Sequence, residues 1–319
     1  MKLLFWGTPE FATPSLLALL GEGFEVAGVV TQPDKPQGRS RSRLIPSPVK
    51  AIATAEKIPV LQPARANSPD FLAEIRALRP DASIVVAYGH ILTLDVIGVP
   101  PRGTFNVHAS LLPALRGAAP IQAAIRQGLG ETGISVMRVV PALDAGPVIL
   151  RIATPIADDE TYGELSVRLS ELGAQALIET LALIEIGAAR ETPQDDAQAT
   201  YAPKPGRGAV TVDWAQPASE VSRMIRSVDP RPGAVTTVSA GPVKLFGAQL
   251  LSDSVPAIGD RGTSATHGTV LAIDDDGMAV ACGSGAIRIA QVQPAGRPLM
   301  SAADWARGRG ISAGQRLRA

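Results

Sequence analysis

The sequence predicts an α/β protein of two domains, in which a Rossmann-like, mostly parallel sheet is followed by a small all-β domain. Three observations lead to this fold class. Apolar strand-like runs alternate with helical periodicity through residues 1–189, a polar, proline-rich stretch at 190–208 has no regular period, and short β-like runs separated by glycine occupy residues 209–319. A chain of 319 residues is also long enough to bury two cores.

The first elements predict a right-handed βαβ unit. Residues 2–6 form a short apolar run, Thr13 and Pro14 supply an N-cap and first-turn pair for a helix through residue 20, and residues 24–31 form the next strand-like run. The turn between the first run and the helix reads Gly-Thr-Pro-Glu rather than G-x-G-x-x-G. A dinucleotide-dependent oxidoreductase, one alternative function, is therefore disfavoured.

The remaining elements continue these two patterns. In the first domain we expect strands at 59–61, 82–87, 131–139 and 148–152 and helices at 48–56, 69–79 and 161–186, with Ser68 as an N-cap. After the stretch at 190–208, which has the composition of an interdomain linker, a helix at 218–228 precedes strands at 234–238, 243–250, 268–273, 278–282 and 286–292. Several short strands in about 110 residues indicate a small barrel or sandwich.

Composition excludes several classes of protein. The formal net charge is zero, so any nucleic-acid partner must be recognised by a local patch. Cys282 is the only cysteine, which excludes an internal disulfide framework and a thiolate metal cluster. The N-terminus lacks the apolar region of a signal peptide, and no segment approaches the roughly 18 uncharged apolar residues of a membrane helix. We therefore expect a cytoplasmic protein that does not enter a membrane.

One such basic patch lies in a loop broken by proline and glycine. From Lys35 to Lys50 there are five basic residues and no acidic one, the others being Arg39, Arg41 and Arg43. Most charge runs of this kind are solvated loops. The alternative is an arm that contacts the phosphates of an RNA backbone. Composition alone leaves both interpretations open.

Polar side chains that could carry chemistry gather near a predicted strand end. Asn106 and His108 stand two residues apart after a β-branched and aromatic run, so on a strand both point to one face. Asp144, in the loop between two later strands, can reach the same sheet edge. An amide and an imidazole can stabilise an oxyanion, and a carboxylate can orient the imidazole or relay a proton. The set favours direct attack of an amine on a carbonyl carbon.

Other chemistries find less support. Ser110 is a weak nucleophile candidate, because it does not stand at a sharp strand-to-helix elbow. A metal site is weak because His108 and Asp144 lack a second histidine at i+4 or a cysteine cluster. His90 and Cys282 are open to a purely structural interpretation.

The motifs around these residues point to a family. Asn106-Val107-His108 is followed by SLLP at 110–113, RGAAPI at 116–121 and LDAG at 143–146. In order and spacing, these motifs resemble the folate-dependent formyltransferase superfamily. The motifs FWGTPEF at 5–11, TQPD at 31–34, PSPVK at 46–50 and VAYG at 86–89 extend the resemblance over nearly the full length, to the branch that acts on methionine carried by initiator tRNA.

The resemblance implies 10-formyltetrahydrofolate as co-substrate and initiator methionyl-tRNA as acceptor, with a role in translation initiation. We also expect an enzyme that holds no metal and is a monomer. The resemblance assigns the catalytic roles to Asn106, His108 and Asp144. It places folate contacts at Ser110, Leu111, Leu112, Pro113, Val86, Ala87, Tyr88 and Ile91, and tRNA contacts at Arg39, Arg41, Arg43 and Lys204. The second domain corresponds to an OB-like β-barrel that holds the tRNA.

The chain departs from the family pattern in three places, and two alternative functions stay open. Ala114-Leu115 stands where a basic and an aromatic residue are frequent, residues 205–209 lack a second lysine and an acidic residue, and Arg231 replaces a common tryptophan. A formyltransferase acting on a nucleotide sugar or on glycinamide ribotide would need neither the basic loop nor the long second domain. A non-catalytic RNA-binding module would need more aromatic residues for base stacking.

Overall fold

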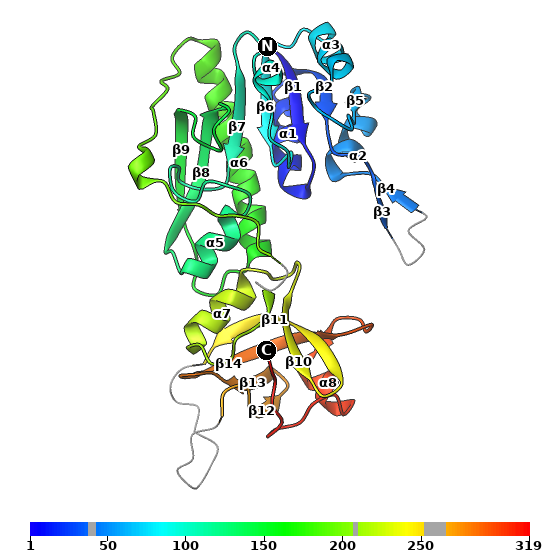
Figure 1. The fold of residues 1–319 in the computed structure, drawn as a ribbon, viewed down its shortest axis with the longest axis vertical. Helices are drawn as coiled ribbons and strands as arrows, with labels where there is room; N and C mark the ends of the chain where they lie inside the picture. The colour runs from blue at the N-terminus through cyan, green and yellow to red at the C-terminus, as the bar shows by residue number, and fades with distance from the viewer. Residues whose placement is uncertain (38–42, 207–209, 252–265) are drawn as a thin grey trace. The chain divides into compact units, whose positions relative to one another are not determined.

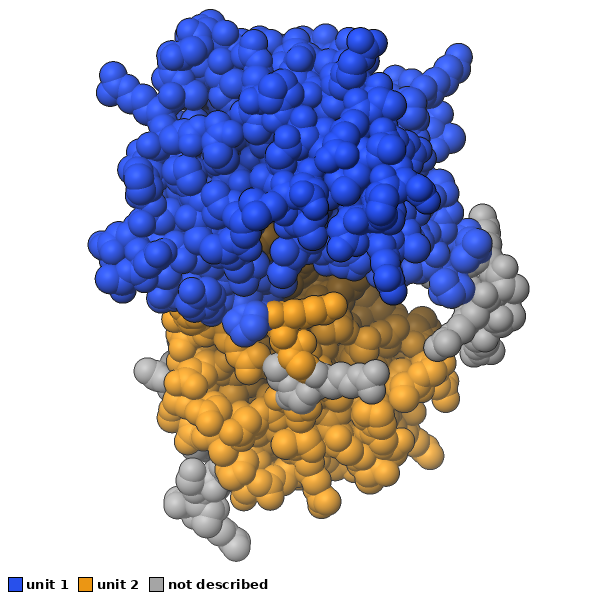
Figure 2. All heavy atoms as spheres, turned by 45° about the horizontal axis from the view of Figure 1, so that its top comes forward, with its two compact units in different colours: residues 1–120, 131–155, 166–203 blue, residues 121–130, 156–165, 204–319 orange. Residues whose placement is uncertain are grey.

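The chain forms two compact units in the computed structural model, which describes residues 1–37, 43–206, 210–251 and 266–319 (Figure 1). Unit 1 comprises residues 1–120, 131–155 and 166–203, and unit 2 comprises residues 121–130, 156–165 and 204–319 (Figure 2). A mostly parallel sheet lies in unit 1 and an antiparallel sheet in unit 2. The predicted fold class is therefore confirmed.

Unit 1 is built on a seven-stranded sheet with the order β5-β2-β1-β6-β7-β8-β9. Its strands are β1 (Lys2–Gly7), β2 (Glu25–Val30), β5 (Val60–Leu61), β6 (Ala82–Val86), β7 (Thr104–His108), β8 (Glu131–Arg138) and β9 (Val148–Pro155). The strands from β5 to β7 in this order are parallel, whereas β8 and β9 are antiparallel to their neighbours. The carboxyl ends of the parallel strands share one edge, where ligands bind in open α/β sheets.

Helices follow most of these strands. They are α1 (Thr13–Gly21), α2 (Pro48–Ala55), α3 (Pro69–Ala77), α4 (Leu94–Ile97), α5 (Pro120–Gln127) and α6 (Tyr162–Glu185), with 3-10 turns at Glu10–Ala12 and Asp196–Gln198. Leu4 and Trp6 alternate on β1 and belong to the same buried cluster as Phe71 of α3. On α6, a Cβ at Gly173 would lie 3.0 Å from Val107 Cγ1, so this helix packs closely on β7. In the described ranges, no helix has the length and apolar character needed to cross a membrane.

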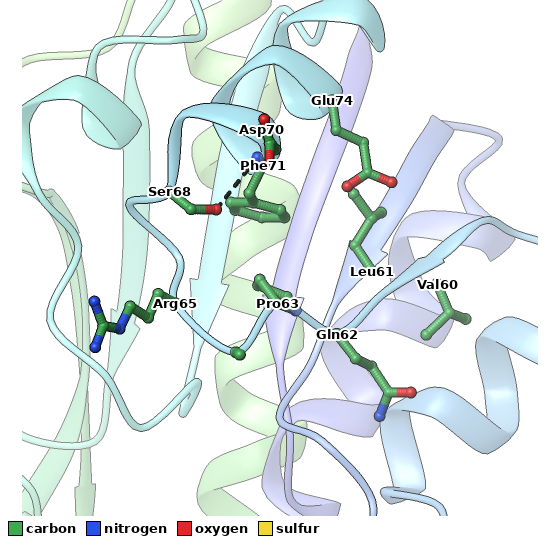
Figure 3. A pocket seen from close by; sticks show the side chains of 10 residues that line it. Val60, Leu61, Gln62, Pro63, Arg65, Ser68, Asp70, Phe71 and Glu74 are labelled. Atoms are coloured by element: carbon green, nitrogen blue, oxygen red, sulfur yellow. Dashed lines mark hydrogen bonds between the residues drawn. The ribbon is translucent and has the colours of Figure 1, made fainter.

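Local capping agrees with the sequence at one helix and not at another. Ser68 caps α3 as predicted, since its Oγ accepts a hydrogen bond from Phe71 N at 3.4 Å (Figure 3). The prediction that Thr13 caps α1 is wrong, because Ala12 occupies the N-cap position and the Thr13 hydroxyl donates to Glu10 O. A 3-10 turn at Glu10–Ala12 runs directly into α1, so Thr13 already has helical backbone angles and does not occupy the N-cap position.

The predicted irregular loop contains regular structure at its two ends. β3 (Lys35–Gln37) and β4 (Arg43–Ile45) pair as an antiparallel ribbon that extends from the sheet domain in Figure 1. The sequence did not show this, because strands this short carry no measurable alternation. Arg39 and Arg41, both predicted to contact tRNA, lie outside the described residues.

Much of the predicted interdomain linker packs on unit 1. Residues 191–203, which we call the strap, belong to that unit by their contacts. Thr192 bridges Val148 of β9, and Tyr201 bridges Arg116 in the loop after β7. The strap is therefore a structural part of the sheet domain, although its composition is typical of a free linker.

Unit 2 is an antiparallel β domain with the strand order β10-β11-β14-β13-β12, in which the short β15 also pairs with β14. The strands are β10 (Ala234–Val238), β11 (Gly241–Leu250), β12 (Val270–Asp274), β13 (Gly277–Ala281), β14 (Ala286–Pro294) and β15 (Met300–Ser301). Arg318 bridges Thr237 of β10, and Arg316 bridges Thr269 just before β12. The C-terminal segment thus joins both edge strands, which closes the sheet into the expected barrel.

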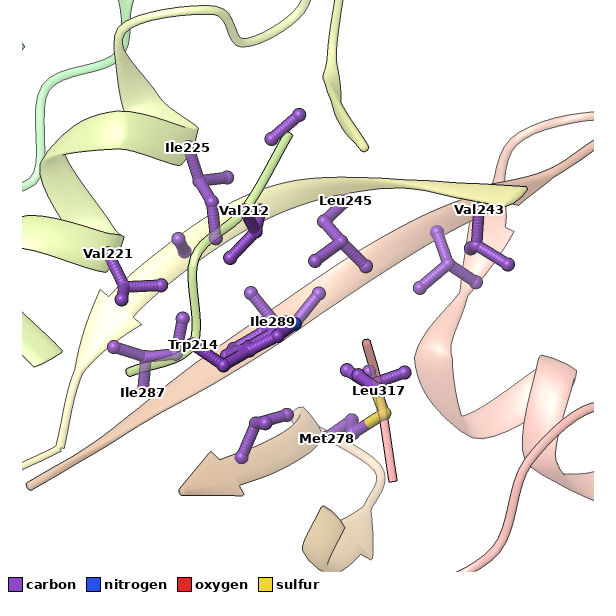
Figure 4. Close-up of a cluster of buried hydrophobic side chains, with 14 of the residues drawn as sticks. Val212, Trp214, Val221, Ile225, Val243, Leu245, Met278, Ile287, Ile289 and Leu317 are labelled. Carbon is purple, nitrogen blue, oxygen red and sulfur yellow. The ribbon is translucent and has the colours of Figure 1, made fainter. Parts of the chain in front are cut away.

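The barrel encloses one apolar core (Figure 4). Val221 and Ile225, one helical turn apart on α7 (Ala218–Arg226), face the same core as Trp214 and Ile287. Trp214 and Trp305 are both buried, which favours the core interpretation of these aromatic residues over base stacking. α8 (Ala302–Arg307) and β15 could not be predicted from the sequence, because both are too short to show a period.

Candidate active site

β7 carries the first two residues of the predicted catalytic set. Asn106 lies opposite Val85 of β6 and Met137 of β8, and His108 lies opposite Ser135 at the end of the strand. The two side chains share one face of the sheet because they are two residues apart. The predicted pairing of an amide and an imidazole at a carboxyl-end edge is therefore present in the fold.

The imidazole of His108 is buried and its orientation is fixed. Its Nε2 lies 3.1 Å from the main-chain oxygen of Leu115. A carbonyl oxygen can only accept, so Nε2 carries the hydrogen and donates it. Nδ1 is left as the reactive nitrogen, and it faces Asp144 Oδ2 at 3.8 Å. In the neutral imidazole, Nδ1 can accept a proton, and only the imidazolium can donate from this atom.

Asp144 lies in the loop between β8 and β9, as predicted. Its Oδ2 accepts a hydrogen bond from Gly117 N at 2.8 Å, and the side chain is largely buried. The backbone at Gly117 has φ +121°, and a Cβ there would lie 2.8 Å from Ala202 O. Glycine is therefore required at the position that offers its N–H to the carboxylate. This N–H fixes one oxygen of the carboxylate, and the imidazole lies nearby.

The amide of Asn106 remains open. The residue is partly buried, and among the described residues none hydrogen-bonds to its side chain. A polar group that is half-shielded on a rigid strand keeps its donor available for a bound molecule. Asn106, His108 and Asp144 thus form a cluster with one fixed carboxylate, one oriented imidazole and one free amide.

The segment from Ser110 to Pro113 is held rigidly beside this cluster. Ser135 Oγ donates to Ser110 O at 2.7 Å and accepts from Leu112 N at 3.0 Å. The Ser110 hydroxyl itself donates to Ala114 O at 2.6 Å, so its hydrogen is used by the main chain rather than by a catalytic base. Ser110 and Leu112 are buried, whereas Leu111 and Pro113 are partly exposed.

The second predicted folate segment has two buried and two exposed members. Val86 is fully buried, and Tyr88 packs edge-on against Trp6 with ring centroids 5.2 Å apart. Burial raises the pKa of the Tyr88 hydroxyl. Ala87 and Ile91 are exposed, and Ile91 is 76% exposed to solvent. The structure therefore leaves Ala87 and Ile91 as the accessible part of this predicted pocket.

Two of the predicted tRNA contacts, Lys204 in unit 2 and Arg43 in unit 1, lie among the described residues. Lys204 is exposed, and Arg43 lies on β4. Lys50, counted above as part of the basic run, is bound to Asp34 Oδ2 and to Gln62 Oε1, at 2.7 Å each. Asp34 lies one residue outside the run, so the count of charges along the sequence did not show this partner.

A shallow pocket lies elsewhere on unit 1, between β5 and α3 (Figure 3). It is lined by Val60, Leu61, Gln62, Pro63, Ala64, Arg65, Ser68, Asp70, Phe71 and Glu74. This set includes none of the predicted site residues. Its charged side chains are exposed, so the pocket offers no polar group that is held ready for a ligand.

Arg116 and Gln194, which hydrogen-bond to each other beside the cluster, were not predicted from the sequence as site residues. Arg116, only 3% exposed, donates from Nε and Nη2 to Gln194 Oε1, and Nη2 also donates to Asp196 Oδ1. In the sequence, Arg116 is part of the RGAAPI motif at 116–121, and Gln194 lies in the predicted linker. A charged residue in an otherwise apolar motif is the one sequence signal that could have indicated a buried ion pair.

Comparison with known proteins gives the class. The family model for formyl transferase matches residues 1–181, and the model for the formyl transferase C-terminal domain matches residues 209–310. The chain therefore belongs to the formyltransferase family and is an enzyme.

Full-length relatives narrow the class. The methionyl-tRNA formyltransferase of Moorella thermoacetica is 43% identical over 97% of this chain and 96% of its own length, and that of Pseudomonas paraeruginosa is 44% identical over 94% and 93%. By these matches, the chain is a member of the methionyl-tRNA formyltransferases within the family.

Solved structures agree on the fold. HypX from Aquifex aeolicus, in complex with tetrahydrofolic acid, matches 95% of this chain with a TM-score of 0.66 at 20% identity, and the chain spans 46% of HypX. The sugar 3N-formyl transferase WlaRD matches 93% of this chain and 99% of its own, with a TM-score of 0.65 at 17% identity. At these sequence identities the matches show a shared fold and say nothing of the formyl acceptor.

Proposed function

We propose that this enzyme transfers the formyl group of 10-formyltetrahydrofolate to the α-amino group of methionine on initiator methionyl-tRNA, for translation initiation. Two full-length relatives are named for this acceptor, and HypX, which shares the fold, binds tetrahydrofolic acid. The observation that carries the chemistry is that Asn106 and His108 share one face of β7 at its carboxyl end, where His108 Nδ1 lies 3.8 Å from the Asp144 carboxylate. In this proposal unit 1 holds the folate, and Lys204 and the barrel beyond it hold the tRNA.

The reaction needs no covalent enzyme intermediate. The free amine of methionine attacks the formyl carbon, and the carbonyl oxygen becomes an oxyanion beside Asn106, which donates from its amide. His108 donates to the same oxyanion from Nδ1 when the imidazole is protonated. Asp144 relays the proton lost by the amine, through a water, to N10 of the leaving tetrahydrofolate. The C–N10 bond then breaks, and formylmethionyl-tRNA and tetrahydrofolate result.

Substitution of Asn106 tests the oxyanion assignment. Loss of one oxyanion donor typically lowers turnover about 10²- to 10³-fold. We expect Asn106→Ala to lower kcat by that factor and to leave KM nearly unchanged, in single-turnover and steady-state assays. Asn67→Ala, the same change at an exposed position, serves as the matched control. A near-normal single-turnover rate for Asn106→Ala would show that its amide is not an oxyanion donor.

A comparison of acceptors tests the substrate. Formyl transfer from 10-formyltetrahydrofolate is measured to methionylated initiator tRNA, to free methionine and to a nucleotide-linked amino sugar. We expect efficient transfer to the tRNA-linked amine only. Preferred formylation of the amino sugar would overturn the proposed acceptor and would retain the formyl chemistry.

The basic segment 35–43 is proposed as an RNA-contacting arm on the strength of its sequence. The triple change Arg39→Ala, Arg41→Ala and Arg43→Ala should weaken tRNA binding and reduce the slope of log Kd against log salt by about 2 to 3, since each lost phosphate contact removes nearly one released counterion. The control removes the same charge from exposed positions on another part of unit 1, at Arg65, Arg76 and Arg79. If both triple variants had the same slope, the arm would be a solvated loop that makes no specific contact with the tRNA phosphates.

A further inference from the structure

The side-chain amide of Gln194 hydrogen-bonds to the two loops that carry Asp144 and the residues after His108. Its Nε2 donates to Asp144 O at 2.8 Å and to Gly146 O at 2.7 Å. Its Oε1 accepts from Arg116 Nε at 3.1 Å and from Arg116 Nη2 at 2.9 Å. One amide of the strap thus connects the loop between β8 and β9 to the loop after β7.

The loop that Gln194 holds is in a conformation that needs support. Asp144 has φ +48°, in the left-handed region, which costs free energy for a residue with a side chain. The carboxylate has its place only if the main chain keeps this turn, because Oδ2 must meet both Gly117 N and the edge of His108. The bonds from Gln194 to the carbonyl of Asp144 and to that of Gly146 hold the turn on both sides of its centre.

The strap also fixes the loop on which the imidazole rests. Thr200 Oγ1 accepts from Leu115 N at 2.9 Å, and Thr200 O accepts from Arg116 N at 2.8 Å. Leu115 is the residue whose carbonyl accepts from His108. The strap is therefore bonded to both partners of the imidazole, to Leu115 directly and to Asp144 through Gln194.

We propose that Gln194 is a positioning residue for formyl transfer, which holds the Asp144 carboxylate at His108 Nδ1. The inference rests on the proposed function of this cluster. Gln194 acts through its donated hydrogen bonds and touches neither substrate. Because displacement of a catalytic group by about 1 Å can cost about 10²-fold in rate, loss of these bonds lowers turnover without removing any binding contact.

Two near-isosteric variants separate the donated bonds from packing. Gln194→Met keeps the volume and loses every hydrogen bond, whereas Gln194→Glu keeps the acceptor for Arg116 and places an oxygen against the carbonyls of Asp144 and Gly146. We expect both variants to lower kcat about 10- to 100-fold, with KM for the formyl donor changed less than about 2-fold. Gln198→Ala is the matched control, since this exposed strap glutamine donates to Asp195 alone.

A readout apart from activity distinguishes positioning from general loss of structure. The chain has three histidines, so the imidazole NMR signals of His108 can be assigned by comparison with His108→Gln. We expect the Gln194 variants to shift the His108 signals as Asp144→Asn does, and Gln198→Ala to leave them in place. His90 and His267 signals should stay unchanged in all variants, which reports an intact fold.

The outcomes are distinct. Active wild-type enzyme with unchanged kcat and unchanged His108 signals in Gln194→Met would overturn the inference and leave the proposed function standing. Lowered kcat together with altered His90 and His267 signals would also overturn it, in favour of a structural role. Absence of formyl transfer by the wild-type enzyme would instead overturn the proposed function.

Discussion

His108 Nδ1 lies 3.8 Å from Asp144 Oδ2, while Nε2 of the same ring donates to the carbonyl of Leu115. The ring therefore has only one nitrogen free to exchange a proton, and that nitrogen faces a carboxylate. The carboxylate is anchored by the hydrogen bond from Gly117 N. Asp144 therefore has two separable roles. To hold the loop it needs one oxygen that accepts from Gly117 N, whereas to take part in the reaction it needs a carboxylate that can accept a proton.

Asp144→Asn tests the chemical demand. The amide oxygen can still accept from Gly117 N, so the loop is expected to fold normally, but the side chain can no longer relay a proton. We expect kcat for formyl transfer to fall about 10²- to 10⁴-fold, the usual range for loss of a proton-transferring group. Asp95→Asn, the same change on the exposed helix α4, is the control. A decrease smaller than about 3-fold would contradict the role of Asp144.

Ser135→Ala tests the support of the predicted folate segment. Ser135 is fully buried, and its removal leaves Leu112 N and Ser110 O without their partner. An unpaired buried polar group costs about 1–3 kcal/mol. We expect the free energy of unfolding in urea to fall by about that amount and KM for the formyl donor to rise.

Ser170→Ala is the matched control for that substitution. Ser170 is also buried, but its Oγ donates to Val167 O, three residues earlier on the helix α6. Such a bond competes with the helix's own backbone bonds, so its loss should cost less than about 1 kcal/mol. Equal destabilisation by the two changes would mean that the Ser135 bonds contribute nothing specific to the 110–113 segment.

The sequence predicted those parts of the fold and site that depend on local patterns. The alternation around Asn106 and His108 placed both on one strand face, and the position of Asp144 between two strand-like runs placed it at the same edge, which β7 and β8 confirm. The roles of these residues stay predictions until they are tested. The sequence predicted Ser68 as an N-cap because a capping hydrogen bond involves only the residue itself and the backbone three residues later.

Contacts between distant polar residues could not be predicted. Gln194 and Arg116 are 78 residues apart, and neither belongs to a periodic segment. A glutamine in a proline-rich stretch has the same local signature whether it is solvated or bound to backbone carbonyls. The same reason explains Lys50, whose partner Asp34 lies on the other side of the β3–β4 ribbon in the sequence. These hydrogen bonds form only when the fold brings the two residues together, so no local sequence pattern indicates them.

Asp229 provides a pH-dependent prediction for the barrel unit. Burial raises the pKa of its carboxyl, the hydrogen bond from Gly247 N opposes this, and the neighbouring Glu164 raises it further. A carboxyl whose pKa is higher in the folded state than in the unfolded state destabilises the fold when ionised, and the penalty disappears as pH falls through the raised pKa. We therefore expect Asp229→Asn to increase stability relative to wild type at neutral pH, with a difference that narrows on acidification.

Asp213→Asn should show the opposite trend and serves as the control. Hydrogen bonds from Gln216 and from Ala215 N lower the pKa of the Asp213 carboxyl. Its contribution to stability is present at neutral pH and is lost as pH falls through the lowered pKa. Melting temperatures of both variants between about pH 2 and 8 check the two signs, since the Asp213 carboxyl titrates below its usual pKa of 3.8. Parallel curves for Asp229→Asn and wild type would contradict the first.

Cys282 should report the unfolding of the barrel. The thiol is 6% exposed in the core of unit 2, and burial raises its pKa to about 12. Since only the thiolate attacks a disulfide reagent, about 10⁻⁴ of the thiol is reactive at pH 8 even where the reagent can reach it. We expect negligible labelling by an aromatic disulfide in native buffer and one labelled thiol per chain in guanidinium, with none in Cys282→Ala. Complete labelling within minutes in native buffer would contradict the burial of Cys282 and show that the core of unit 2 opens readily.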